Sequence, residues 1–412
     1  MRLLRDRKLL LCVGGGIAAY KAPEVVRQFQ GQGAQVQVAM TRAARSFITP
    51  LTLQAISRNP VASELLSPSE DATIGHIRIA EAADVVLVAP ATADLIARMA
   101  AGMADDIVTA AILATTAPVV VAPAMNSHML VHPAVAANLE RLRSWSYRIV
   151  APDTGELACG YEGPGRMPDA DVLVEAVAAA LSAQDLAGKS LLVSAGPTRE
   201  PIDPVRFISN RSSGRMGYAI AVAAHRRGAR VTLVSGPTAL AAPRGCETVT
   251  LETAAEMNEA MRKRVTDADV VVMVAAVADY RPVAMAGSKI KKRSETLDLA
   301  LTRTEDVLAG LSRLRGTRLL VGFAAETEDL RANARAKLTA KGLDLIVAND
   351  VGRTGRGFDT ATNAAVLIDR EGEEVETGLV SKEDLADLIL DRVVRLLAAG
   401  ESGSSRRVEK LR

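Results

Sequence analysis

One pattern occurs twice along the chain and limits the folds that it can adopt: an apolar run, a glycine-rich turn, an amphipathic helix and a second apolar run. In the N-terminal half, the apolar run 9–13 leads into the glycines 14–16. Apolar side chains then recur at helical spacing over residues 22–29, before the second run at 36–39. This order and length predict a βαβ unit of a parallel sheet.

The second half repeats this order. The apolar run 191–194 is followed by Ala195-Gly196-Pro197, a long polar loop, a helix expected to begin near Met216, and the run 231–234. Two short segments also agree between the halves, since GAQVQV returns as GARVTL and ADVVLV returns as ADVVVM. Because both pairs keep their order, we predict an α/β protein of two doubly wound, Rossmann-like domains. Valine-rich strands with few charges predict sheets buried on both faces.

The length of 412 residues also favours two domains over one. The segment 182–189 follows an expected helix and is the best place for a boundary. We therefore predict domains at 1–188 and 189–400. Residues 401–412 are mostly polar and are expected to form a flexible tail.

Composition excludes several classes of protein. With 49% hydrophobic and 24% charged residues, the chain is expected to fold rather than to remain disordered. A formal net charge of +2 gives no general attraction to nucleic acid or to a membrane surface. The cysteines form no CxxC pair, and prolines interrupt the charge-free stretch 107–139, so neither a disulfide framework nor a membrane span is expected. These features favour a cytoplasmic enzyme.

The glycine turn 14–16 ends a strand and opens a helix, where backbone N–H groups and the helix dipole favour an anion. Thr41 and the segment 89–93 also follow expected strands, and doubly wound sheets bind ligands beyond the carboxyl ends of their strands. A phosphate site is therefore favoured over a tight turn without a ligand. The turn reads GGGIAAYK, however, and matches neither GxGxxG nor a Walker loop.

Five histidine and cysteine positions have more than one interpretation. His76 opens a polar-to-apolar segment and fits a helix start as well as a catalytic role. His128 and His132 have the spacing of a metal pair, but no third ligand is apparent. Cys12 falls in an expected core strand. Cys159 lies in a glycine-rich loop near an arginine and is a candidate acid or reactive thiol.

Polar and basic residues follow the strands expected in the second half. The segment 209–217 is rich in serine and glycine directly before a helix, which suits an anion as well as a simple helix cap. Asp279 ends a buried strand, a position suited to a ribose hydroxyl or a metal-bound water. The basic run 289–293 and the pair Lys337 and Lys341 fit either phosphate binding or a solvated surface.

Five motifs together carry a family resemblance. They are PAMN at 123–126, ACG at 158–160, ISNRSSG at 208–214, AAVADY at 275–280 and KIKK at 289–292. With them, the chain resembles the bacterial bifunctional phosphopantothenoylcysteine decarboxylase/phosphopantothenate–cysteine ligases of coenzyme A synthesis. The resemblance extends from Lys8 to about Val394, with both halves in the family's order.

The resemblance implies a flavodoxin-like N-terminal domain that binds FMN and converts 4′-phosphopantothenoylcysteine into 4′-phosphopantetheine and CO2. His76 would be the active-site histidine, Asn126 would orient the substrate carboxylate, and Cys159 would return a proton. The residues that would line the flavin site are Gly15, Gly16, Thr41, Ala91, Thr92, Ala93, Met103 and Thr109.

It also implies a C-terminal nucleotide-binding domain that joins cysteine to 4′-phosphopantothenate with CTP and Mg²⁺, through an acyl-cytidylate that gives CMP and pyrophosphate. Asn210 would serve the acyl intermediate and Lys289 would neutralise the phosphates. The residues that would bind CTP are Ala275, Asp279, Lys289, Thr304, Glu305, Asp306, Val307, Phe323, Lys337 and Lys341. The resemblance assigns no metal ligands, although Mg²⁺ is expected near Asp279.

Members of the family form trimers through the flavin half and dimers through the ligase half, which implies a homo-oligomer, up to a dodecamer, acting on small molecules without nucleic acid or membrane. Two other functions are weighed against this one. A nicotinamide-dependent reductase would use similar βαβ units, but GxGxxG and a ribose-binding acid are missing. A regulatory flavoprotein without activity would not need Asn126, Cys159 and a complete ligase half.

Overall fold

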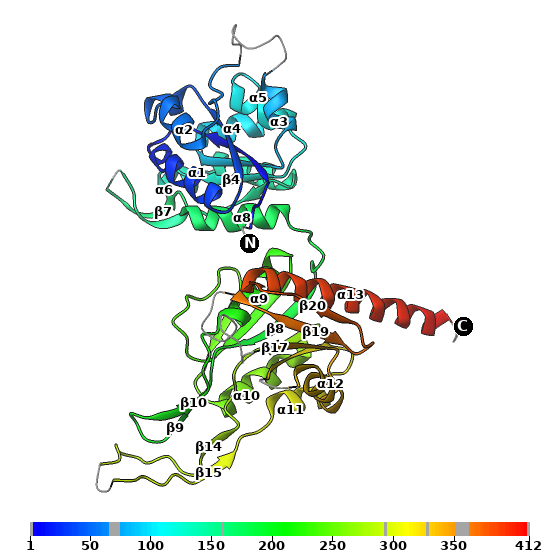
Figure 1. Ribbon diagram of the computed structural model, residues 1–412. Helices are drawn as coiled ribbons and strands as arrows, with labels where there is room; N and C mark the ends of the chain where they lie inside the picture. The colour runs from blue at the N-terminus through cyan, green and yellow to red at the C-terminus, as the bar shows by residue number, and fades with distance from the viewer. Residues whose placement is uncertain are drawn as a thin grey trace. The chain divides into compact units, whose positions relative to one another are not determined.

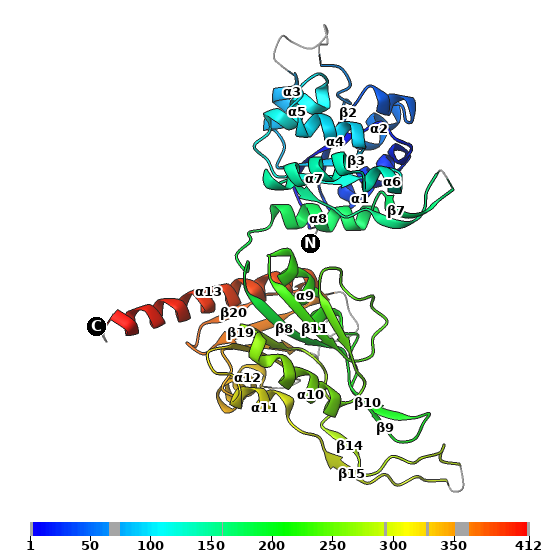
Figure 2. The same ribbon diagram turned by 180° about the vertical axis from the view of Figure 1, so that it is seen from behind.

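The computed structural model describes residues 3–65, 75–158, 160–291, 295–326, 329–350 and 362–409. The chain divides into two compact units between Ala183 and Gln184, inside the segment expected to hold the boundary. In each unit, helices cover both faces of a sheet that is wholly or mostly parallel (Figure 1 and Figure 2). The predicted fold class of two doubly wound α/β domains is confirmed.

The N-terminal unit has a parallel sheet with the strand order β2-β1-β3-β4-β5. Its strands are β1 (Lys8–Val13), β2 (Gln35–Met40), β3 (Val85–Ala91), β4 (Val119–Pro123) and β5 (Arg148–Ile149). The chain goes from β1 to β2 on one side and then to β3 on the other. Such a reversal of direction creates a crevice at the carboxyl ends of the strands, where ligands bind.

Two groups of helices bury the two faces of this sheet. One face carries α1 (Ala22–Gly31), α2 (Pro50–Ser57) and α8 (Ala170–Leu181). The other carries α3 (Gly75–Glu81), α4 (Ala93–Ala100), α5 (Ile107–Ala114) and α7 (Pro133–Ser144). The remaining elements are the short helices η1 (Ile17–Lys21), η2 (Ala43–Ser46) and α6 (Ser127–Leu130), and the antiparallel hairpin of β6 (Asp153–Glu156) and β7 (Glu162–Arg166).

Helix α1 forms where the sequence predicts it. Its stripe of Val25, Val26 and Phe29 is buried against the sheet. Pro23 lies in the first turn, where the N–H that it lacks has no intrahelical partner to lose. The helix ends at Gly31, before β2 begins.

The C-terminal unit has an eight-stranded sheet with the order β12-β11-β8-β13-β16-β17-β19-β20. Its strands are β8 (Ser190–Ala195), β11 (Arg230–Ser235), β12 (Glu247–Thr250), β13 (Val270–Met273), β16 (Leu319–Glu326), β17 (Leu345–Asp350), β19 (Ala365–Asp369) and β20 (Glu374–Glu376). The first six strands in this order are parallel, and β19 and β20 add an antiparallel edge. The reversal of direction lies between β8 and β13.

Helices again cover both faces. One face carries α9 (Arg215–Arg226) and α13 (Lys382–Glu409), and the other carries α10 (Ala254–Arg264), α11 (Val307–Arg313) and α12 (Leu330–Ala340). Two antiparallel pairs extend away from the sheet of this unit (Figure 1): β9 (Arg199–Pro201) with β10 (Phe207–Ser209), and β14 (Tyr280–Pro282) with β15 (Leu301–Arg303). The remaining elements are η3 (Val265–Asp267) and the pair β18 (Thr362–Asn363) and β21 (Val380–Ser381).

The end of the chain differs from the tail that the sequence suggests. Residues 401–409 continue α13 as far as Glu409. No proline interrupts this helix. Each glycine costs only about 1 kcal/mol of helix stability relative to alanine, which does not end a long helix.

Candidate active sites

A cavity of about 1790 Å³ opens at the carboxyl edge of the N-terminal sheet. Loops after β1, β2, β3 and β4 line it, together with the β6–β7 hairpin. Pockets that enclose one small molecule typically measure about 300–1,000 Å³. The cavity is therefore large enough for a cofactor together with a substrate.

The glycine turn packs so closely that only its backbone faces the cavity. A Cβ atom on Gly15 would lie 2.2 Å from the Cβ of Ala43, and one on Gly14 would lie 2.4 Å from the carbonyl oxygen of Pro90. The Gly14 N–H donates to the same carbonyl at 3.0 Å. Because side chains are excluded at both positions, a ligand can approach the backbone directly, which is the geometry of a phosphate cradle.

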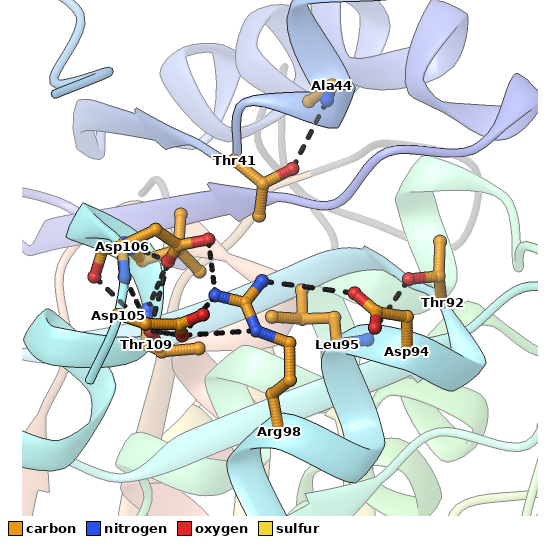
Figure 3. A network of polar contacts seen from close by, with 10 residues as sticks. Thr41, Ala44, Thr92, Asp94, Leu95, Arg98, Asp105, Asp106 and Thr109 are labelled. Atoms are coloured by element: carbon orange, nitrogen blue, oxygen red, sulfur yellow. Dashed lines mark hydrogen bonds and ion pairs between the residues drawn. The ribbon is translucent and has the colours of Figure 1, made fainter. Parts of the chain in front are cut away.

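Arg98 joins the first turns of α4 and α5 at the wall of this cavity (Figure 3). Its guanidinium lies 2.9 Å from Asp106 and 3.8 Å from Asp94, and it also pairs with Asp105. Asp106 caps α5 by accepting the backbone N–H of Thr109 at 2.9 Å. The hydrogen bond from Arg98 lowers the pKa of Asp105. One cation, only 17% exposed, therefore holds three carboxylates together.

Asn126 faces the cavity from the loop after β4. Its Oδ1 accepts the backbone N–H of His128 at 2.8 Å, which orients the amide as the cap of α6. The β6–β7 hairpin rests on the same loop, because the Met125 N–H donates to Gly165 at 3.0 Å and the Ser127 hydroxyl donates to Pro164 at 2.7 Å. Asn126 and the hairpin are thus held against one another at the mouth of the cavity.

Cys12, His128 and His132 contact different parts of the N-terminal unit. Cys12 is fully buried in β1, and burial raises the pKa of its thiol, which fits a packing role. His132 caps α7 through its Nδ1, and the ring of His128 packs edge-on against Tyr161 with the ring centroids 6.0 Å apart. In the described part of the chain, no three acidic, histidine or cysteine side chains gather as metal ligands would.

The C-terminal unit has a cavity of about 130 Å³ at its own switch point. The glycine-serine segment 212–217, at the start of α9, forms one wall. Ala275 and Phe323, which follow or belong to β13 and β16, form another. The described wall also includes Asn349 and Lys382, from β17 and α13.

Four candidate CTP residues meet beside this edge of the sheet. The ammonium of Lys337 donates to the Phe323 carbonyl at 3.1 Å, and that of Lys341 lies 2.9 Å from the Asp306 carboxylate. Burial opposes ionisation of Asp306, but hydrogen bonds from Lys341 and from the start of α11 lower its pKa overall. The cluster therefore carries two cations and one carboxylate at the point where α11 and α12 approach each other.

Asn210 lies against the segment that follows β13. Its Nδ2 donates to the Val277 carbonyl at 2.9 Å. Thr304 is tied to the same segment, since its hydroxyl donates to Ala278 at 2.6 Å and its N–H donates to Asp279 at 3.0 Å. The structure thus brings together residues that are up to 94 positions apart, from Asn210 to Thr304.

Two family models together cover most of the chain. The flavoprotein model matches residues 1–182, and the model of the DNA/pantothenate metabolism flavoprotein C-terminal domain matches 186–397. The coenzyme A biosynthesis bifunctional protein CoaBC of Vibrio parahaemolyticus is 48% identical over 96% of this chain and 100% of its own length. That of Escherichia coli K12 is 49% identical over 95% of this chain and 97% of its own length. The chain is a member of the CoaBC family.

As a CoaBC protein, the chain is a bifunctional enzyme of coenzyme A biosynthesis, with a flavoprotein decarboxylase domain followed by a ligase domain. A crystal structure of the C-terminal domain of CoaBC is also similar, with 41% identity, a TM-score of 0.46, and coverage of 53% of this chain and 100% of that one. None of the described helices is long and apolar enough to cross a membrane.

The residues inferred for the flavin site of this CoaBC protein fall into two groups. Those that line the large cavity are Gly15, Gly16, Thr41, Thr92, Ala93, Met103 and Asn126. Ala91 and Thr109 are buried behind the wall, where Thr109 acts through its contact with Asp106. Cys159 lies outside the described residues, although Ala158 and Gly160 on either side of it line the cavity.

His76 does not line the cavity in the described part of this chain. It belongs to the first turn of α3, and its Nδ1 is buried without a hydrogen-bond partner among the described residues. A buried ring nitrogen without a partner is costly. The structure therefore leaves the active-site role of His76 to be tested.

On the ligase side, the inferred residues are also divided. Ala275 and Phe323 line the small cavity, while Asp306, Lys337 and Lys341 form the neighbouring charged cluster. Lys289 is exposed, and the N–H of the next residue is held by Asp203 at 3.1 Å. Glu305 accepts a hydrogen bond from Asn258, and Val307 is buried in the core.

Sequence reasoning missed Arg98, Asn349, Asn363 and Lys382. Arg98 lies inside a helix pattern and resembles a solvated side chain, although the acidic pair 105–106 downstream was a usable signal. The other three lie in the last 64 residues, where no local motif pointed to a ligand. Only the topology of the sheet brings them to the segment 212–217.

Proposed function

We propose that the ligase domain joins cysteine to 4′-phosphopantothenate with CTP and Mg²⁺, and that the N-terminal domain decarboxylates the product, 4′-phosphopantothenoylcysteine, with FMN. The observation that carries the proposal is the match of the whole chain to CoaBC proteins, with a cavity at the switch point of each sheet. The product of the ligase is then the substrate of the decarboxylase.

The N-terminal cavity fits FMN by its size and by its glycine turn. Gly15 and Gly16 would hold the phosphate with backbone N–H groups, at a turn where a side chain on Gly15 would collide with Ala43. Thr92, which caps α4, and Thr41 would support the turn from the next strands. When bound, FMN supplies a reversible electron acceptor that lets the carbon next to the departing CO2 delocalise its charge.

The chain's own residues would bind and orient the substrate. Asn126 is held by His128, so that its neutral amide can position the carboxylate without a charge that stabilises the ground state. The β6–β7 hairpin would exclude water, since it rests on residues 125–127 at the mouth of the cavity. Cys159 would return the proton from this hairpin, and His76 would exchange a proton with the substrate thiol.

In the ligase domain, the carboxylate of 4′-phosphopantothenate would attack the α-phosphorus of CTP and displace pyrophosphate, and the cysteine amine would then attack the acyl carbon and displace CMP. Lys289, Lys337 and Lys341 would neutralise negative charge on the nucleotide, and Asn210 would position the acyl group. Since the described residues form no group of metal ligands, Mg²⁺ would arrive on the CTP phosphates and take few protein ligands, with Asp279 as one candidate.

The proposal includes a homo-oligomer with trimeric flavin domains and dimeric ligase domains, in the cytoplasm. A trimer would allow His76 to act in catalysis, because His76 is not among the described residues that line the cavity of its own chain and could serve the cavity of a neighbouring copy. Mass measurement of the intact flavin-loaded assembly would decide, since a monomeric active enzyme contradicts this part.

Product analysis tests the function directly. The purified protein is incubated with 4′-phosphopantothenate, cysteine, CTP and Mg²⁺, and the products are identified by mass spectrometry. We expect 4′-phosphopantetheine, CO2, CMP and pyrophosphate. Accumulation of 4′-phosphopantothenoylcysteine would leave the ligase in place and contradict the decarboxylase, while the absence of any product would contradict both.

A further inference from the structure

The C-terminal unit has a second cavity, of about 780 Å³, whose described lining residues include none of those assigned above to CTP or to the acyl intermediate. It lies beyond the carboxyl ends of β11 and β12 and is bounded by residues 235–238, by residues 248–252 and by α10. Pockets that enclose a small molecule typically measure about 300–1,000 Å³. The proposed ligase reaction has a third substrate, cysteine, to which no cavity has been assigned.

The charges on the wall of this cavity balance one another. The described lining residues include three cations and three carboxylates, namely Arg199, Lys263 and Arg264 with Glu252, Glu256 and Glu259. The carboxylates would repel a triphosphate or another polyanion as much as the cations attract it. The balance therefore favours a ligand that has no net charge.

Most of these charges already have partners within the protein. The ammonium of Lys263 lies 2.6 Å from the carboxylate of Glu259, and the guanidinium of Arg264 lies 3.7 Å from that of Glu247. The carboxylate of Glu256 accepts two backbone N–H groups directly before α10, at 2.7 and 3.0 Å. These four lining side chains are therefore occupied in holding α10 and the strand beside it.

Arg199 and Glu252 are different, since neither side chain forms an ion pair or a hydrogen bond among the described residues. The guanidinium of Arg199 stacks on Phe207, 4.5 Å from the centroid of the ring. The two backbones are adjacent, because the Arg199 N–H donates to the Glu252 carbonyl at 2.7 Å. One free cation and one free carboxylate thus extend from neighbouring points of the wall.

Hydroxyl groups add neutral hydrogen-bonding positions to the same cavity. Those of Thr238, Tyr218 and Ser235 form a chain with 3.2 Å at each step. Thr248 also lines the cavity, and its Oγ1 is buried without a hydrogen-bond partner among the described residues. A rotation about its Cα–Cβ bond would turn this hydroxyl toward a ligand, which would supply the missing partner.

The cavity lies next to the residue that is proposed to position the acyl group. Arg199 in β9 is directly opposite Ser209 in β10, and Asn210 follows Ser209. The Ser209 hydroxyl donates to the Thr198 carbonyl at 2.7 Å, which holds the two strands together at this point. A molecule bound by Arg199 therefore starts close to the acyl group, as a nucleophile must.

We propose that this cavity binds the zwitterionic amino-acid substrate of the ligase, which is cysteine in the proposed reaction. Arg199 would bind the α-carboxylate and Glu252 the α-ammonium. An amino acid carries both groups on one carbon atom, which matches two free charges that extend from adjacent backbone. The volume also leaves room for the acyl end of the cytidylate. The inference rests on the proposed ligase function and adds the location of its third substrate.

Steady-state kinetics of Arg199→Met and Glu252→Gln tests this site, because each variant removes one charge and roughly keeps the length of the side chain. We expect the KM for cysteine to rise about tenfold or more, the effect of losing a charge-assisted hydrogen bond. The KM values for CTP and 4′-phosphopantothenate should not change. Pyrophosphate release in a single turnover without cysteine should keep its wild-type rate, since the acyl-cytidylate forms before the amino acid reacts.

Three further comparisons make the test decisive. Arg199→Lys keeps the charge and should recover most of the affinity for cysteine, which separates binding from packing on Phe207. Arg262→Met removes an exposed cation of α10 that is not among the described lining residues, and it should leave every KM unchanged. Glu252 is exposed, so Glu252→Gln remains informative even if Arg199→Met fails to fold.

A wild-type KM for cysteine in Glu252→Gln, or an increase in the KM for CTP in its place, overturns the amino-acid site. A wild-type protein that forms no amide would instead overturn the proposed function.

Discussion

The guanidinium of Arg98 lies 2.9 Å from the carboxylate of Asp106 and thereby ties the first turn of α5 to α4, at the wall of the N-terminal cavity. Asp106 also holds the backbone of Val108 and Thr109. The ion pair and the helix cap thus depend on the same carboxylate. Replacement of Arg98 should therefore affect both the shape of the cavity and the stability of α5.

Replacing Arg98 with methionine should weaken flavin binding and lower stability. The variant leaves Asp94, Asp105 and Asp106 without their shared cation at the cavity wall, where the FMN phosphate would add further negative charge. We expect a loss of about 1–3 kcal/mol in the free energy of unfolding. Flavin titration and thermal unfolding would measure the two effects.

Arg143→Met is the matched control, since Arg143 pairs with Glu140 on the exposed side of α7. It should change stability by no more than about 0.5 kcal/mol and leave flavin affinity unaltered. Equal effects of the two variants would mean that the position of Arg98 beside the cavity has no special importance.

Gly15→Ala should damage the cofactor site even though it adds a single methyl group. The new Cβ would lie 2.2 Å from the Cβ of Ala43 and 2.7 Å from its backbone carbon, so the turn must move. We expect about 1–3 kcal/mol of destabilisation and a loss of at least about tenfold in flavin affinity. Both are measurable on the purified variant by denaturant unfolding and flavin titration.

The control for this prediction is Gly31→Ala at the end of α1. Nothing lies within 4 Å of a Cβ placed there, and alanine favours a helix by about 0.5–1 kcal/mol over glycine. This variant should keep wild-type flavin affinity and gain slight stability. A Gly15→Ala protein that behaves like it would show that the tight turn is not needed.

Much of this architecture could be predicted because it is encoded locally. An apolar run in the sequence predicts strand β8, and the helical pattern after it predicts helix α9. The short segments that agree between the two halves indicate two domains. Strands β19 and β20 show the limit of such reasoning. Both strands are short, and no repeated segment of the sequence indicates that they join the sheet as an antiparallel edge.

The sites divide in the same way. Gly15, Gly16 and Thr41 were found from the sequence because they directly follow strands at the edge where such sheets bind ligands. Lys382 was not, since it reaches the start of α9 only through the packing of α13 on the sheet. It is 165 residues from Gly217 in the first turn of α9. Long-range placement of this kind leaves no periodic signal.

The stability of the C-terminal unit should depend on pH through Asp306. Its carboxylate caps α11 and pairs with Lys341, and these contacts lower its pKa below the ordinary value of 3.8 despite partial burial. A carboxyl group with a lowered pKa in the folded state contributes stability that is complete above its unfolded pKa and disappears as pH falls through the folded one. That contribution should therefore begin to decrease near pH 3.8 and be lost once the pH falls below the lowered pKa of Asp306.

Asp306→Asn isolates this contribution, because asparagine can still cap the helix. Urea unfolding at a series of pH values should show the variant less stable than the wild type near neutrality, with a difference that shrinks as pH falls below about 4. A difference that is constant with pH would show that the charge of Asp306 does not contribute.

Asn210→Asp should impair the ligase and spare the decarboxylase. The Nδ2 of Asn210 donates to the Val277 carbonyl at 2.9 Å, and a carboxylate oxygen in its place would face that carbonyl as a second acceptor. This hydrogen bond is exposed, and such a bond contributes a net of about 0.5–1.5 kcal/mol, so we expect a decrease of about 2–10-fold in amide formation. Conversion of supplied 4′-phosphopantothenoylcysteine measures the other domain in the same preparation and should remain at the wild-type rate. A parallel fall in both activities would instead reveal general unfolding and contradict a specific role for Asn210.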